Sequence, residues 1–198
     1  MRVGVTGGIG AGKTTVSESF RNQGAYVIEA DEVGRRAVDD KGVRMDLVAA
    51  FGQEILDTKG DLDRRELGRR AFVDKDAKKI LNGIVWPKLA ELLEDETRHA
   101  LDTDSERTVV VDAALLLEWG KPKDFCDVLV AVTAPESTRI QRSVARLELS
   151  EGEVRDRMAS QLPEEKKLEA ADFVILNDAN EKELEERTLD VWSRIHKT

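Results

Sequence analysis

Residues 4–15, GVTGGIGAGKTT, constrain the fold of this chain more than any other stretch. Gly7 to Thr14 match the pattern G-x-x-x-x-G-K-[ST] in full, between a short apolar run and a helical pattern. Glycines let successive backbone N–H groups converge on phosphate oxygens, and the dipole of the following helix strengthens that attraction. In this motif Lys13 reaches the β- and γ-phosphates and the hydroxyl of Thr14 binds Mg²⁺. A chance match to this pattern would have no reason to lie between a strand and a helix. We therefore interpret the loop as a binding site for a nucleoside triphosphate, with ATP favoured. The residues expected to contact the nucleotide here are Gly8, Ile9, Gly10, Ala11, Gly12, Lys13, Thr14 and Thr15.

Five short apolar segments alternate with helical patterns along the chain. They are RVGVT from residue 2, AYVIEAD from 25, TVVVDAALLLE from 108, DVLVAVTA from 127 and DFVILND from 172. Such alternation is typical of βαβ units and of a parallel sheet covered on both faces. We therefore predict an α/β fold with a five-stranded parallel sheet flanked by helices.

Two long excursions interrupt this alternation. Residues 32–107 are too long for one crossover helix and hold several helical patterns, the longest of which is punctuated by Pro87. Residues 135–170 are dense in charged side chains. Without an internal repeat or a low-complexity linker, the chain reads as a single domain over 1–198. Its core would comprise about 1–31, 108–134 and 171–198.

Composition narrows the class of protein. The net charge of −9 argues against a nucleic-acid binder, which normally shows a basic stripe. No apolar run reaches the length of a membrane span, and no feature indicates an obligate protein partner. Cys126 is the single cysteine, so an internal disulfide is excluded and the cytoplasm is the simplest compartment. We expect its thiol to be a small buried apolar group, because nothing basic adjoins it.

Two carboxylates end the second predicted strand. The spacing of Glu29 and Asp31 puts both side chains on one face of a strand. The carboxyl ends of such strands border the ligand crevice, where a carboxylate can accept the proton of an attacking hydroxyl. We favour Asp31 as this base, and a helix N-cap for the following EVGRRAV is the alternative.

Charged residues in the later segments offer further candidates. Asp112 ends VVVD, where an acidic residue can hold Mg²⁺ through water or a threonine hydroxyl, or can simply cap the strand. Arg139, Arg142 and Arg146 follow helical spacing along one face. Three guanidinium groups in line can close over a triphosphate, and a solvated face paired with Glu136 and the acids of 148–156 is the alternative. Arg139 and Arg142 are the favoured pair.

At these residues the chain resembles the dephospho-coenzyme A kinase family, from Val3 to about Asn177. The resemblance rests on GVTGGIGAGKTTV, on VIEAD where the family commonly has Asp-x-Asp, and on GDLDRRELGRRAF, which is similar to its G-x-L-x-R-x-x-L element. Further matches are DAALLLE, RIQRSVAR, ASQLPEEKKLEAAD and FVILN.

The resemblance implies a P-loop kinase core with an acceptor-binding helical insert (about 32–107) and a lid (about 135–170). The implied reaction is ATP-dependent phosphorylation of the ribose 3′-hydroxyl of dephospho-coenzyme A, the last step of coenzyme A synthesis. Asp31 matches the family's general base, and Arg64 matches an arginine of the acceptor site. Arg139 and Arg142 match the arginines of the family's lid. Asn177 lies near the expected adenine of ATP. Together with the residues argued above, we expect catalysis from Lys13, Asp31, Arg139 and Arg142, Mg²⁺ at Thr14 and Asp112, and acceptor contacts from Asp31, Arg64, Trp86, Asp112, Leu116 and Glu118.

The chain departs from the family pattern at three positions. Trp86-Pro87 stands where the family usually has His-Pro, Ala114 stands for a proline, and Glu29 for the first Asp of the pair. An indole N–H donates a hydrogen bond but carries no charge, so the Trp86 change bears on acceptor contacts. Two other readings stay open: a nucleoside or nucleoside monophosphate kinase, and a nucleotide-binding module without catalysis.

Overall fold

The computed structural model describes residues 1–119 and 125–197. The chain divides into two compact units, one made of Met1–Glu29 with Thr97–Thr198 and the other of Ala30–Glu96. Within the described ranges, no helix combines the length and the apolar character needed to cross a membrane.

The first unit is built on a five-stranded sheet, and all five predicted strands are confirmed. They are β1 (Arg2–Thr6), β2 (Tyr26–Glu29), β3 (Val109–Asp112), β4 (Val128–Thr133) and β5 (Phe173–Leu176). Every pairing is parallel, and the strand order is β2-β3-β1-β4-β5. Strand β1 lies in the middle, between β3 and β4. The chain leaves its carboxyl end where the strand order reverses, which is where α/β sheets bind their ligands.

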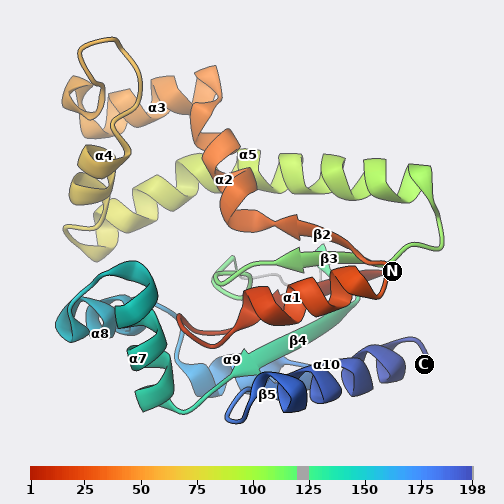
Figure 1. Ribbon diagram of the computed structural model, residues 1–198. Helices are drawn as coiled ribbons and strands as arrows, with labels where there is room; N and C mark the ends of the chain where they lie inside the picture. The colour runs from red at the N-terminus through yellow and green to blue at the C-terminus, as the bar shows by residue number, and fades with distance from the viewer. Residues whose placement is uncertain (120–124, 198) are drawn as a thin grey trace. The chain divides into compact units, whose positions relative to one another are not determined.

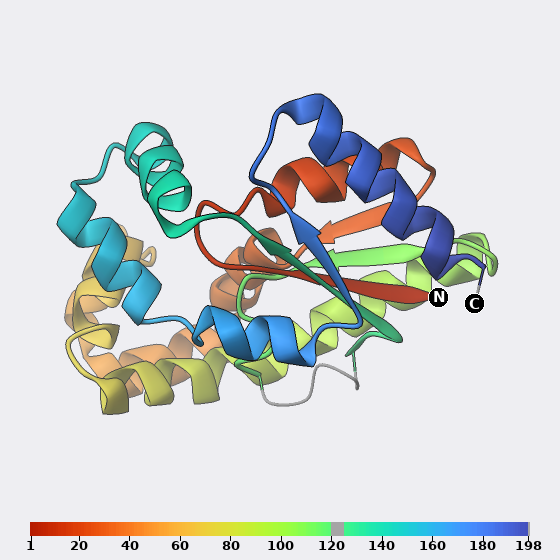
Figure 2. The ribbon, with the colours of Figure 1, turned by 90° about the horizontal axis from the view of Figure 1, so that it is seen from below.

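Helices cover both faces of this sheet (Figure 1). Helices α1 (Lys13–Asn22) and α10 (Glu181–Ile195) lie together on one face, and α9 (Glu164–Ala170) lies on the other (Figure 2). Valine is buried at alternate positions of β1, since Val3 and Val5 are inaccessible to solvent and face α1.

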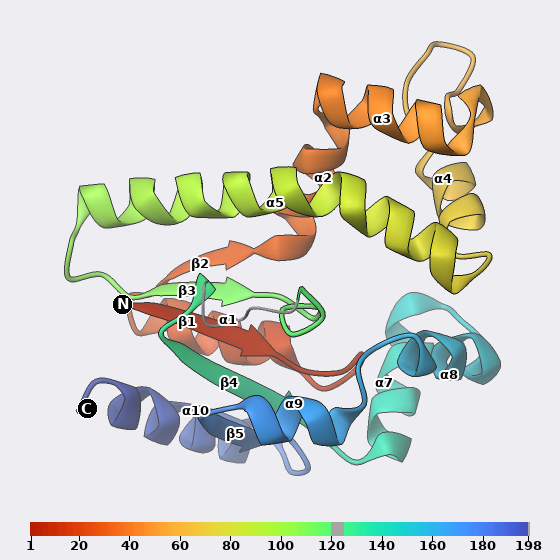
Figure 3. The ribbon, with the colours of Figure 1, turned by 180° about the vertical axis from the view of Figure 1, so that it is seen from behind.

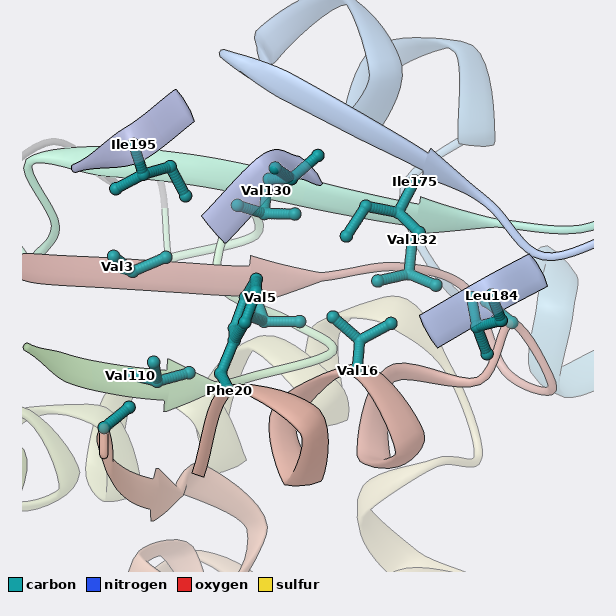
Figure 4. Packing of buried hydrophobic residues seen from close by; sticks show 13 residues of the cluster. Val3, Val5, Val16, Phe20, Val110, Val130, Val132, Ile175, Leu184 and Ile195 are labelled. Carbon is teal, nitrogen blue, oxygen red and sulfur yellow. The ribbon is translucent and has the colours of Figure 1, made fainter. Parts of the chain in front are cut away.

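The core between α1, α10 and the sheet consists mainly of β-branched side chains (Figure 4). Helix α1 contributes Val16 and Phe20, which are four residues apart and therefore lie on one face of the helix. Phe20 also packs against Trp192 of α10, with 5.3 Å between ring centroids. This packing fixes the first turn of α1, and with it the loop that precedes the helix.

Three helices follow β4 in the segment expected to form a lid. They are α7 (Glu136–Leu147), α8 (Glu151–Ala159) and α9. Helices α7 and α8 pack on each other, whereas α9 packs on β4 (Figure 3). Ser150 begins α8 with a capping box, because its hydroxyl and the side chain of Glu153 exchange hydrogen bonds with each other's backbone N–H groups.

The second unit is helical. It contains α2 (Ala30–Asp39), α3 (Lys41–Phe51), the short 3₁₀ helix η1 (Gln53–Ile55), α4 (Arg64–Ala71) and most of α5 (Lys75–Thr103). Pro87 lies inside α5 and does not end it. Pro87 has no N–H, so the i→i−4 hydrogen bond to the carbonyl of Gly83 is missing inside this helix.

Candidate active site

The glycine-rich loop joins β1 to α1, as predicted. Helix α1 begins at Lys13 without a side-chain cap, and its first turn holds no acidic residue. The N-terminus of α1 and its helix dipole therefore favour an anion at this position. Thr14 is exposed on this turn and Lys13 is half-buried. In a chain of net charge −9, this is a local concentration of positive potential.

Asn177 supports the loop from the carboxyl end of β5. Its Nδ2 donates to the carbonyl of Ala11 at 2.9 Å, and the side chain is buried. Gly12 has φ +98°, and a Cβ there would collide with Nδ2 of Asn177. Arg142 in turn donates to the backbone and side-chain oxygens of Asn177, at 3.4 and 3.3 Å. The predicted nucleotide residues Asn177 and Arg142 thus brace the loop, and their contact with adenine or phosphate stays a prediction.

Arg139 lies directly against the loop. Its guanidinium is buried, pairs with Glu164 at 2.6 Å, and occupies the space that a Cβ at Gly8 would need. Its Nε is buried and has no hydrogen-bond partner among the residues that the structure describes. The three arginines lie at the predicted helical spacing within α7, and they differ in burial: Arg139 is buried, Arg142 is half-buried and Arg146 is exposed. Their closing over a triphosphate stays a prediction.

Asp112 is held at the end of β3, beside α1. Its Oδ2 accepts a hydrogen bond from Oγ of Ser17 at 3.0 Å, so the carboxylate is tied to α1. The hydroxyl of Thr14 is on the first turn of the same helix. A hydroxyl and a carboxylate are the hard oxygen ligands that Mg²⁺ prefers, and Mg²⁺ typically takes only one or two carboxylates beside phosphate oxygens and water. These two residues therefore fit that ion in chemical character.

The segment after β3 holds two of the predicted acceptor residues in internal contacts. Leu116 is fully buried and packs against Gly4 of β1, and its contact with the acceptor stays a prediction. Glu118 is held internally as well. Its Oε1 lies 3.1 Å from Nζ of Lys167 and accepts from the backbone N–H of Leu162 at 2.9 Å.

A separate pocket of about 290 Å³ opens within the second unit, close to the lower end of the range for ligand pockets. Asp31, Arg35, Arg64 and Trp86 lie in its lining, together with apolar side chains such as Leu67. One carboxylate, two guanidinium groups and an indole thus share one apolar cavity. The two guanidinium groups suit an anionic ligand, and the indole and the apolar side chains suit a flat or apolar part of the same ligand.

Asp31 occupies a different backbone position from the one expected. It lies in the first turn of α2, after β2 has ended at Glu29, so it does not share a strand face with Glu29. Because Ala30 already begins α2, Asp31 is not the N-cap of that helix either. Its carboxylate is exposed and makes no hydrogen bond or ion pair with any residue that the structure describes. Glu29 instead lies 3.6 Å from Arg21.

Helix α4 places Arg64 in the pocket. Asp63 caps the helix by accepting from the N–H groups of Arg65 and Glu66, which fixes Arg64 at the first helical position. The guanidinium of Arg64 contacts both carboxylate oxygens of Asp39, at 3.0 and 2.9 Å. Glu66 secures the exposed side of the helix: hydrogen bonds from Arg69 and Arg70 lower its pKa to about 2.

Several residues around the two sites escaped prediction from the sequence. Arg35 lies one helical turn beyond Asp31. Ser17 is the partner of Asp112, and three side chains of the segment 161–167 (Gln161, Glu164 and Lys167) reach the loop or its supports. This last group lies in the stretch QLPEEKK. The charged residues of that stretch resemble those of any exposed helix, so the sequence did not single them out.

The chain was also compared with known proteins. The family model for dephospho-CoA kinase matches residues 1–183. Curated relatives named dephospho-CoA kinase include one from Methylococcus capsulatus, 43% identical over 92% of this chain and 90% of that protein. Another, from Thermobifida fusca, is 35% identical over 100% of this chain and 97% of that protein. This chain belongs to the dephospho-CoA kinase family.

Solved structures agree with the family fold. A crystal structure of a Thermus thermophilus protein has 33% identity and a TM-score of 0.85, covering 98% of this chain and 96% of that one. Dephospho-CoA kinase from Campylobacter jejuni has 24% identity and a TM-score of 0.63, covering 98% of this chain and 96% of that one. At that identity the second match bears on the fold alone, and it confirms the predicted P-loop kinase fold.

Proposed function

We propose that this protein transfers the γ-phosphate of ATP to the ribose 3′-hydroxyl of dephospho-coenzyme A, giving coenzyme A and ADP. The observation that carries the proposal is the pocket of the second unit. There the unpaired carboxylate of Asp31 shares a cavity with Arg64 and Trp86, in a member of the dephospho-CoA kinase family. The second unit then corresponds to an acceptor-binding insert, and α7 with α8 to a lid.

The donor half of the reaction is assigned to the glycine loop. The N–H groups of residues 8–15 and the side chain of Lys13 bind the triphosphate. Arg139, already against Gly8, and Arg142 neutralise the charge that spreads over the transferred group. Thr14 and Asp112 would hold Mg²⁺, which supplies charge neutralisation at the β- and γ-oxygens.

The acceptor half is assigned to the pocket. Asp31 orients the ribose hydroxyl and accepts its proton. Arg64 and Arg35 pair with phosphate oxygens of the acceptor, for which guanidinium groups are suited. Trp86 offers a flat apolar surface and one N–H donor, in place of a histidine that can carry charge.

Bond changes in this reaction balance without a further reactant. The oxygen of the 3′-hydroxyl attacks the γ-phosphorus in line, and a new P–O bond forms as the bond to the leaving ADP oxygen breaks. The proton of the hydroxyl goes to the carboxylate of Asp31. Catalysis consists mainly of positioning and charge stabilisation, because the transition state is loose.

The experiment is phosphate transfer from ATP with Mg²⁺ to dephospho-coenzyme A, with adenosine, AMP, CMP and uridine as parallel acceptors. Selective formation of coenzyme A is the expected result, and it would show that Trp86 is compatible with the acceptor. Transfer to one of the other acceptors would mean that the protein is a kinase with another acceptor specificity. Tight ATP binding without any transfer would identify a nucleotide-binding module.

We place this reaction in the cytoplasm, where the single buried cysteine stays reduced. The proposed partners are ATP and dephospho-coenzyme A alone, without nucleic acid, membrane or an obligate protein subunit.

A further inference from the structure

Residues 161–167 contact the phosphate loop through the side chain of Gln161. This segment follows α8 and leads into α9, far from the loop in sequence. Oε1 of Gln161 accepts a hydrogen bond from the backbone N–H of Ile9 at 3.1 Å, across 152 residues of sequence. Ile9 is the third residue of the G-x-x-x-x-G-K-[ST] motif. One peptide of the phosphate cradle is therefore oriented by a side chain from outside the motif.

Two ion pairs hold this segment in place. Glu164 pairs with Arg139 at 2.6 Å and also accepts from Oγ1 of Thr133. Lys167, only 2% exposed, lies 3.1 Å from Glu118 and donates to the carbonyl of Ala114 at 2.7 Å. Both pairs are largely shielded from solvent, so they are screened less than surface pairs. Gln161 is thus presented to the loop from a fixed backbone.

The loop has a second external support at Asn177, which fixes the carbonyl of Ala11. Between the two supports, the N–H of Ala11 bonds to the carbonyl of Gly8 at 3.2 Å. Phosphate binding by such a loop depends on N–H groups that already converge before the ligand arrives. Fixing the peptides on both sides of Gly10 removes the main freedom that the glycines introduce.

We propose that Gln161 is a positioning residue for the triphosphate: by holding the N–H of Ile9, it keeps the loop in the curvature that binds ATP. Gln161 acts through the peptide of Ile9. It therefore changes the affinity for nucleotide and does not change the affinity for the acceptor. The inference rests on the proposed use of ATP but not on the identity of the acceptor.

The test compares three variants of the full chain. Gln161→Met keeps the length of the side chain and removes the acceptor oxygen. Gln161→Glu keeps an acceptor oxygen and adds a negative charge. Glu165→Gln changes an exposed residue of the same segment and is the matched control. Each is measured for binding of a non-hydrolysable ATP analogue with Mg²⁺ by calorimetry, for steady-state KM of ATP and of dephospho-coenzyme A, and for melting temperature.

For Gln161→Met we expect the dissociation constant of the analogue and the KM of ATP to rise about tenfold, the usual effect of one lost hydrogen bond. The KM of dephospho-coenzyme A should stay within about twofold, and the melting temperature should fall by no more than about 4 °C, the cost of one hydrogen bond to stability. Gln161→Glu should bind the analogue more weakly than wild type at low salt, and the difference should shrink in about 0.5 M NaCl as the added charge is screened. Glu165→Gln should match wild type throughout.

Three results would overturn the proposal. Analogue binding by Gln161→Met equal to wild type would mean that the bond to Ile9 does not matter for nucleotide. Tighter binding would mean that Gln161 competes with phosphate for the N–H of Ile9. An equal rise in both KM values with a lower melting temperature would mean a general structural role. Since analogue binding needs no acceptor, a wild-type protein that fails to phosphorylate dephospho-coenzyme A would refute the proposed function and leave this test intact.

Discussion

The buried pair between Lys167 and Glu118 permits a quantitative prediction. The side chain of Lys167 is 2% exposed and that of Glu118 is 17% exposed, and their charged atoms are 3.1 Å apart. Lys167→Met removes one charge and leaves the other shielded from water. Breaking a buried pair in this way costs about 3–5 kcal/mol. Glu118 keeps one hydrogen bond, from the N–H of Leu162, so we expect the lower end, about 3 kcal/mol.

The neighbouring residue provides the matched control. Lys166 pairs with Glu169 at 2.7 Å, but the two side chains are 60% and 63% exposed. Lys166→Met should therefore change the free energy of unfolding by less than about 0.5 kcal/mol. The assay is urea denaturation followed by far-UV circular dichroism at 25 °C.

A double variant tests the cause of the loss. Lys167→Met with Glu118→Leu removes both charges and should recover most of the stability, to within about 1 kcal/mol of wild type. The coupling energy between the two positions should then be about 2 kcal/mol or more. The reasoning fails if Lys167→Met alone stays within about 1 kcal/mol of wild type, or if the two single losses simply add in the double variant.

Three further predictions concern the loop, the base and the cysteine. Asp31→Asn should lower kcat by about 10²- to 10⁴-fold with an unchanged KM for ATP, and unchanged turnover in the kinase assay would remove Asp31 from the role of base. Gly12→Ala should abolish ATP binding in calorimetry, because its Cβ would meet Asn177. Gly24 has the same φ of +98° but open space around it. Gly24→Ala should therefore bind ATP normally and lose only about 1–2 kcal/mol of stability to backbone strain. Burial raises the pKa of the Cys126 thiol from its ordinary value of 9.0 to about 11, so the neutral thiol is favoured in the folded state. Its contribution to stability should be complete below pH 9 and be lost as the pH rises from 9 toward 11, which urea denaturation across that range would detect against Cys126→Ala.

Local patterns in the sequence predicted the elements around the nucleotide site. The glycine motif and the apolar runs act over a few residues, where backbone sterics and hydrophobic burial decide the outcome. The five strands and the buried state of Cys126 are therefore confirmed. The ordered set of motifs also predicted the family, which the comparisons confirm.

Boundaries between elements were harder to predict. Asp31 looked like a strand residue because AYVIEAD is apolar, but β2 pairs only as far as Glu29, opposite Asp112. The pairing of β2 ends where its neighbour β3 ends, and Asp112 comes from 83 residues further along the sequence. Pro87 punctuates the longest helical pattern in the sequence, and helix α5 continues through it.

Long-range contacts decided which charged side chains serve the site. Arg139 and Arg146 follow the same helical spacing in sequence, yet one is buried against Gly8 and the other is exposed. Lys167 stands next to Lys166 in sequence, and only Lys167 reaches Glu118. The sequence by itself determined that a phosphate loop follows β1. Only the tertiary structure decided that Gln161, Asn177 and Arg139 hold that loop, because the packing of α7 and α9 determines which of many similar polar residues lose contact with water.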